Sequence, residues 1–302
     1  MSEVMEPIVI VQILVAAAAD IAFAFSVGAT LLAPGEAQRR TLVRKALFAW
    51  LAAQWIALPL QASSMSGTPL REVGAAIPLV LAHSHYGLMW ATGTVAGVLA
   101  LIVSQRLIGR TAGDAVILVT LAIVGFSHAA TSHAADSRGF FLAEIVHTAH
   151  LMATAGWAGV VITAAWPLRQ VFDSSSPDAC ENTVRLSNVA TLVFLVAIAT
   201  GGYDAHRELG GSLSTITTSV WGILLAVKTL TVICITFVAA INRFVYLQSV
   251  RKGHLGSLGA FVRLLELEAV LMVVVLATTA ILGHSAPPTE SAKPVGPLPL
   301  NG

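Results

Sequence analysis

Charged side chains are scarce in this chain of 302 residues: Asp, Glu, Lys and Arg together make up 11%, against 56% hydrophobic residues. A soluble domain carries about 25% charged residues, which it needs to cover its surface. The apolar residues fall in runs of the roughly 20 residues that cross a bilayer as a helix. With a mean hydropathy of +0.81, the sequence predicts an all-α, polytopic bundle in a lipid bilayer.

Other features are absent as well. The two cysteines, Cys180 and Cys234, lie far apart and form no CxxC pair, which argues against a thiolate metal site or a disulfide framework. A net charge of +1 gives no reason to expect a nucleic-acid partner. The chain contains no Walker loop, HExxH motif, nucleophile elbow or dinucleotide fingerprint. We therefore expect that it is not an enzyme.

The apolar runs predict eight membrane spans within one membrane domain, residues 1–290, followed by a flexible outward tail, residues 291–302. The predicted spans are Ile8–Leu32, Ala46–Gln61, Leu81–Ser104, Asp114–Ala130, Phe140–Trp166, Leu186–Tyr203, Ser219–Ile241 and Leu264–Gly283. Ser84–Gly93 resembles Ser219–Lys228, since both have Ser-x-aromatic-Gly at the start of a span. This match predicts a weak parallel repeat of four plus four spans, with halves 1–135 and 136–290.

The basic residues predict the orientation. Twelve of the seventeen Lys and Arg residues follow the first, third, fifth and seventh spans, whereas the opposite loops and the tail hold four. Loops rich in Lys and Arg are cytoplasmic, so both termini are expected on the outward side of the membrane.

Eight of the nine histidines then fall at the outer face, and His254 is the exception. A general preference of histidine for membrane interfaces would favour both faces equally. His147 and His150 are three residues apart on a predicted helix and share a face, so they can grip one metal ion. We expect the ligands to come from six histidines: His83, His85, His128, His133, His147 and His150. Nitrogen donors without cysteine suit copper, zinc, nickel or haem iron.

Two ionisable residues lie deeper. Asp20 is near the middle of the first span and Lys228 is well inside the seventh. An isolated charge inside a membrane costs at least about 2.5 kcal/mol, so each is expected to face the bundle interior. Their similar depth predicts an intramembrane charge pair, although each of them is also explained by separate contacts with hydroxyls, carbonyls or water.

Four segments resemble the CopD family of bacterial copper-resistance membrane proteins. They are HLMATAGWAG (150–159), LSNVATLVFLVAIATG (186–201), the stretch 219–243 that ends in Asn242-Arg243, and the stretch from Glu268 to Pro288. The resemblance implies an eight-helix inner-membrane protein that handles copper, as Cu(I) or Cu(II), often beside a separate CopC-like periplasmic carrier. It implies copper roles for His128 and His150.

The leading hypothesis is a copper-binding permease that takes copper from the periplasm toward the cytoplasm. Two alternatives stay open. Histidines on membrane helices also suit a b-type cytochrome with axial haem ligands. A copper chaperone or assembly factor would bind the ion at the outer face without moving it across the membrane.

Overall fold

The computed structural model describes residues 7–32, 36–131, 140–172, 178–209 and 219–285. Within these ranges, eight helices are long and apolar enough to cross a membrane. They are α1 (Pro7–Leu32), α2 (Glu36–Ser66), α4 (His85–Arg106), α5 (Thr111–Ala130), α6 (Phe140–Ala165), α7 (Ala179–Glu208), α9 (Val220–Ile241) and α11 (Leu258–Leu282). The predicted all-α membrane bundle is confirmed, and the predicted tail 291–302 lies outside the described residues.

Shorter helical elements connect these eight. They are η1 (Leu70–Ala75), α3 (Ala76–His83), η3 (Arg169–Phe172), η4 (Asn242–Tyr246), α10 (Leu247–Arg251) and η5 (Leu255–Ser257). The segment η4 is a π-helical turn that continues α9 directly into α10. Together these three elements form one long rod of 32 residues, Val220–Arg251.

The helix α2 begins ten residues before the predicted second span because a buried ion pair holds its charged first turns. Arg39 is only 7% exposed. Its Nη1 donates to Asp114 Oδ2 at 3.1 Å and to the Thr30 carbonyl oxygen at 3.4 Å. This contact joins the end of α1, the start of α2 and the start of α5. Hydropathy alone assigned Arg39 to a loop.

The predicted third span is interrupted at Ser84, which separates α3 from α4. The Ser84 hydroxyl oxygen accepts a hydrogen bond from the Gly87 amide at 2.9 Å and caps the N-terminus of α4. Ser219 caps α9 in the same way, by accepting from the Gly222 amide at 2.9 Å. The two Ser-x-aromatic-Gly segments thus have the same local structure, while the four-plus-four repeat stays a prediction.

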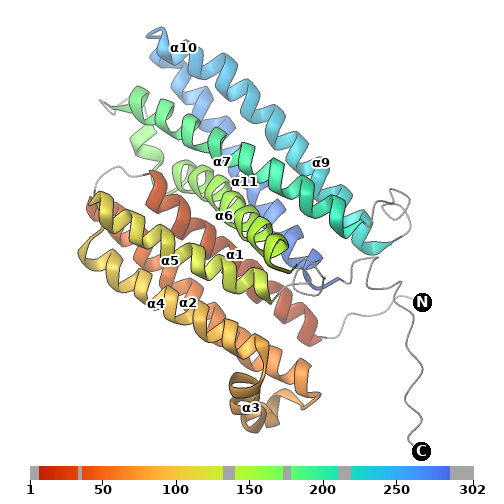
Figure 1. The fold of residues 1–302 in the computed structure, drawn as a ribbon. Coiled ribbons are helices and arrows are strands. Elements are labelled where there is room, and N and C mark those ends of the chain that lie inside the picture. The colour runs from red at the N-terminus through yellow and green to blue at the C-terminus, as the bar shows by residue number, and fades with distance from the viewer. Residues whose placement is uncertain (1–6, 33–35, 132–139, 173–177, 210–218, 286–302) are drawn as a thin grey trace, which may run out of the picture.

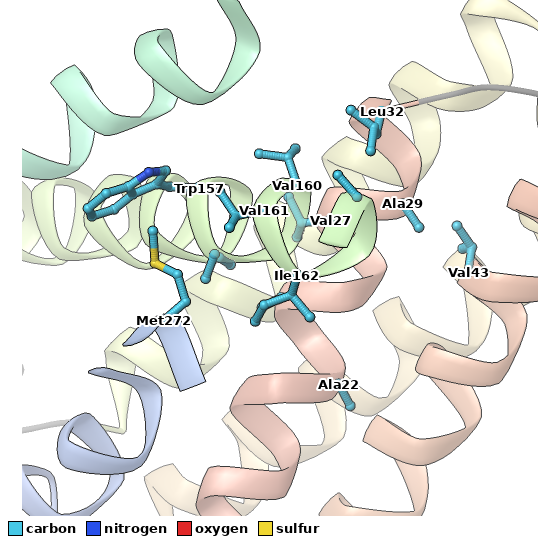
Figure 2. Packing of buried hydrophobic residues seen from close by; sticks show 14 of the residues in the cluster. Ala22, Val27, Ala29, Leu32, Val43, Trp157, Val160, Val161, Ile162 and Met272 are labelled. Carbon is cyan, nitrogen blue, oxygen red and sulfur yellow. The ribbon is translucent and has the colours of Figure 1, made fainter. Parts of the chain in front are cut away.

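The helices α1 and α6 lie side by side at the centre of the bundle (Figure 1). The helices α2, α4 and α5 pack on one side of this central pair, and α7, α9 and α11 pack on the other. The main apolar core runs along this central contact. Figure 2 shows Val27 of α1 near Val161 and Ile162 of α6, with Ala29 on the side of Val43 and Met272 of α11 directed toward Trp157.

Two glycines let α1 and α6 approach at backbone distance. A Cβ built on Gly28 would overlap the Gly159 backbone, and one built on Gly159 would overlap the Ala24 carbonyl oxygen. Lipid tails are as apolar as leucine, so small residues that permit close packing contribute much of the association between membrane helices. The crossing of Gly28 and Gly159 therefore sets the separation of the central pair.

Gly159→Ala is expected to destabilise the bundle, because its methyl group would meet backbone that cannot rotate away. Overpacking a buried contact costs about 1–3 kcal/mol, which corresponds to roughly 2–4 °C in Tm for each kcal/mol. Thermal unfolding of the detergent-solubilised protein measures the loss. Gly202→Ala is the control, since nothing lies within 4 Å of a Cβ at that position. Equal melting of the two variants would contradict the close approach.

Candidate metal centre

A cavity of about 460 Å³ lies at the end of the bundle where α5 and α11 finish. Its wall is formed by α1, α5, α6, α7, α9 and α11, with Trp50 from α2. Seven titratable side chains line the cavity: Asp20, His128, His147, His150, Asp204, Lys228 and His284. Three of the six histidines predicted as ligands therefore share one cavity.

His147 and His150 lie on the same face of α6, as their spacing predicts, and their ring centroids are 6.4 Å apart. His147 Nδ1 is 2.8 Å from Oδ2 of Asp204, a residue of α7 that is 7% exposed. The carboxylate can only accept, so Nδ1 of a neutral His147 carries the proton and Nε2 keeps its lone pair. Metal-binding histidines almost always have such a partner on their second nitrogen.

His150 is oriented in the same way by α7. Its Nδ1 lies 3.1 Å from the Ala197 carbonyl oxygen and 3.2 Å from Thr200 Oγ1. The Thr200 hydroxyl already donates to the Val196 carbonyl oxygen at 2.6 Å, so both neighbours accept from Nδ1–H and Nε2 stays unprotonated. The ring packs on Gly201, where a Cβ would lie 2.6 Å from His150 Cε1. Only glycine leaves room for the imidazole there.

Two further histidines approach from helix ends. His128 is in the last turn of α5, and His284 follows α11. His284 Nδ1 lies 2.8 Å from the Ala280 carbonyl oxygen, so this ring also presents Nε2. The predicted ligand set left out His284, although GHSA after the eighth span echoes SHA after the fourth. Sequence distance hides this proximity, because the ends of α5 and α11 meet only in the folded bundle.

Asp20 and Lys228 line the same cavity. The charge of Lys228 interacts with the Asp20 carboxylate and also with the His150 imidazole. The two residues that hydropathy singled out thus line one cavity with the paired histidines, and a direct pair between them stays a prediction. The wall around them is largely apolar, which strengthens such interactions relative to water.

The other predicted ligands lie elsewhere. His83 ends α3 and is exposed. His85 begins α4, and its Nε2 lies 3.1 Å from the Ala130 carbonyl oxygen, so this ring links α4 to the end of α5. Neither residue lines the cavity. His133 falls outside the described residues.

No three His, Cys, Asp or Glu side chains form a ready-made metal cluster within the described part of the chain. His147 and His150 share the cavity with His128 and His284, but their ring centroids are 6.4 Å apart, so side-chain rotation is needed before both can hold one ion. A third protein ligand requires one of these end-of-helix side chains to rotate toward the pair. Water is the alternative third ligand.

Comparison with known proteins supplies the family. Residues 1–143 match the copper resistance protein D-like N-terminal domain, and residues 182–282 match copper resistance protein D. The chain belongs to the copper resistance protein D (CopD) family. It is also similar to the inner membrane protein YebZ of Escherichia coli (strain K12), with 23% identity over 209 residues. That match covers 68% of this chain and 70% of YebZ. No solved structure matches the chain.

Some of the residues that line the cavity lie inside the two regions matched to CopD, and others lie outside them. Asp20 and His128 fall in the first matched region, and Asp204 and Lys228 fall in the second. His147 and His150 lie between the two regions, and His284 lies two residues beyond the second. The family match thus makes this a copper-related membrane protein, whereas the argument for the paired histidines rests on their geometry.

Gly201→Ala is expected to weaken metal binding while the bundle stays folded, because the added methyl displaces the His150 ring rather than backbone. Misplacing a ligand through its support typically costs about 10–100-fold in metal affinity. Competition titration with copper measures this loss. Gly202→Ala, one residue further along α7, should bind as the wild type does. Equal affinity in both variants would show that the His150 position does not matter.

Proposed function

We propose that this protein is a copper-binding permease of the inner membrane that takes copper from the periplasm through the histidine cavity toward the cytoplasm. One observation carries the proposal. His147 and His150 share a face of α6 and line one cavity, and an acceptor on α7 holds each Nδ1–H, so that each Nε2 is free for a metal ion. Membership of the CopD family supports copper as the metal.

The donor set favours Cu(II) at this site. The cavity offers imidazole nitrogens and carboxylate oxygens, and the described residues that line it include no cysteine or methionine. Soft sulfur ligands select Cu(I), whereas tetragonal nitrogen and oxygen sites suit Cu(II). Met152 packs behind Gly125, with its sulfur 3.4 Å from where a Cβ of that glycine would be. It fills the core rather than the cavity.

The distribution of Lys and Arg supports periplasmic termini, with the histidine cavity facing the periplasm. A separate CopC-like carrier is the natural donor of the ion in this arrangement. Asp20 and Lys228 lie on the inward side of the cavity and form the next stage of the path. With the cavity empty, the ammonium of Lys228 balances Asp20, and an arriving copper ion repels it.

The two alternative functions differ from this proposal in testable ways. A b-type cytochrome needs axial imidazoles on opposite faces of one haem, which His147 and His150 cannot supply from adjacent turns of one helix. A Soret band in the purified protein would favour the cytochrome. A chaperone would bind copper but would not carry it into sealed vesicles.

The double substitution His147→Ala/His150→Ala should abolish tight copper binding, because it removes both oriented nitrogens. Metal analysis after dialysis gives the stoichiometry, and uptake of labelled copper into proteoliposomes tests transport. His206→Ala is the matched control: it lies in the last turn of α7, is exposed and does not line the cavity. Full copper content in the double variant would refute the site, and binding without uptake would favour the chaperone.

Substitutions at the deeper pair should change copper affinity in opposite directions. Lys228→Met removes a positive charge that acts on His150 and should tighten Cu(II) binding, whereas Asp20→Asn removes a negative charge and should weaken it. A tenfold change corresponds to about 1.4 kcal/mol, a reasonable size for one charge in a partly hydrated cavity. Isothermal titration measures both affinities. Changes in the same direction would contradict the electrostatic role of the pair.

A further inference from the structure

A second cavity, of about 250 Å³, lies at the opposite end of the same helices. The first turns of α9 line the cavity that contains His147 and His150, and η4, which continues α9, lines the second cavity. Aromatic and aliphatic side chains from α6, α7 and α11 form much of the wall, including Trp157, Phe194, Phe261 and Leu265. Two titratable side chains line it, Arg243 and Glu268.

The carboxyl group of Glu268 is buried in this cavity and has few polar contacts. It is 4% exposed, and the hydrogen bond that the described residues give it comes from Asn242 Nδ2 to Oε1, at 3.0 Å. Burying an ionised carboxylate costs several kcal/mol (on the order of tens in the idealised limit) unless a charge and several donors offset it. A single neutral amide does not meet that requirement.

The neighbouring positive charges are engaged elsewhere. Arg243 Nη1 donates to the Ser187 carbonyl oxygen at 2.9 Å and also to the Ser187 hydroxyl, so its guanidinium is bound to α7. Arg263 Nε donates to the Gly259 carbonyl oxygen within its own helix. Arg169 forms an ion pair of 2.8 Å with Glu266. Among the described residues, none of these cations forms an ion pair with Glu268, so uptake of a proton is the simplest way to neutralise its carboxylate.

Asn242 is suited to both protonation states of such a carboxyl group. Its Nδ2 donates to Glu268 and also to the Phe261 carbonyl oxygen, while its buried Oδ1 has no partner. An asparagine amide has donors on one side and an acceptor on the other, and rotation by half a turn exchanges them. The same side chain can thus donate to a carboxylate or accept from a carboxylic acid.

The local backbone adds a second indication of function. Asn242 is the first residue of the π-helical turn η4 and is 4% exposed. Single π-helical turns inside longer helices occur frequently at functional sites. An ionisable side chain inside a membrane segment likewise marks an ion or proton pathway by default.

We propose that this second cavity is a proton-binding site in which Glu268 takes up and releases the proton. A hydronium ion in the cavity transfers its proton to the free carboxylate oxygen, leaving water and a neutral carboxylic acid, and release reverses this step. The volume is sufficient for several waters to carry the proton. A proton is favoured over a hard metal cation, because it binds a single carboxylate oxygen, whereas such a cation takes six or more oxygen ligands. This proposal does not depend on copper binding at the other end.

Infrared spectroscopy of the full-length protein tests this directly. A carboxylic-acid C=O band should appear as pH falls and vanish as pH rises, with the shift on deuteration that an acid proton gives. Glu268→Gln should remove this band, because glutamine is neutral at every pH and can still accept from Asn242. Glu268→Asp should move the band rather than abolish it. Glu266→Gln, two residues away, is the matched control and should leave it unchanged.

The remaining outcomes overturn the proposal. If the wild type and Glu268→Gln show the same pH-dependent acid bands, or if neither shows one, Glu268 does not exchange a proton. An acid band displaced by sodium or potassium chloride at constant pH would show a metal-cation site instead. Copper titration of Glu268→Gln separates the two ends of the molecule: unchanged binding is expected, whatever the infrared result.

Discussion

The backbone contact between Gly28 of α1 and Gly159 of α6 is the constraint on which the rest of the structure depends. In lipid, burial of apolar surface does not drive helices together, so a close approach must be built into the sequence as small residues. With α1 and α6 held at this distance, Asp20 on one helix and His147 and His150 on the other come to line one cavity. The two flanking groups of helices then close its sides.

A shared physical rule governs both cavities. Each polar group inside the bundle needs a partner, and in both cavities the described residues leave part of that need unmet. At the cavity that His147 and His150 line, α7 holds the Nδ1 side of the paired imidazoles and leaves Nε2 open. At the other cavity, Asn242 gives Glu268 a single hydrogen bond. In our two proposals, these unmet polar groups are the ones that accept a copper ion or a proton, and α9 and α11 extend from one cavity to the other.

Much of the fold and part of the candidate site were predictable from the sequence, and the errors have clear physical causes. Hydropathy indicates the eight spans, and the loop charges together with the histidines indicate which end carries the cavity. Hydropathy misplaced the start of α2, because it cannot see that Asp114 neutralises Arg39. Spacing along the chain paired His147 with His150, but it could not show that α5 and α11 finish together and bring in His284. Nor could it show that His83 and His85, on either side of the Ser84 cap, do not line the cavity.

X-ray absorption at the copper edge of the metal-loaded protein tests the central claim most directly. A nitrogen and oxygen first shell is expected, with the outer-shell scattering of two imidazoles, and this imidazole signal should be lost in His147→Ala/His150→Ala. A shell containing sulfur, or an imidazole signal that survives the double substitution, would contradict the account, because copper would then be held by residues outside the pair on α6.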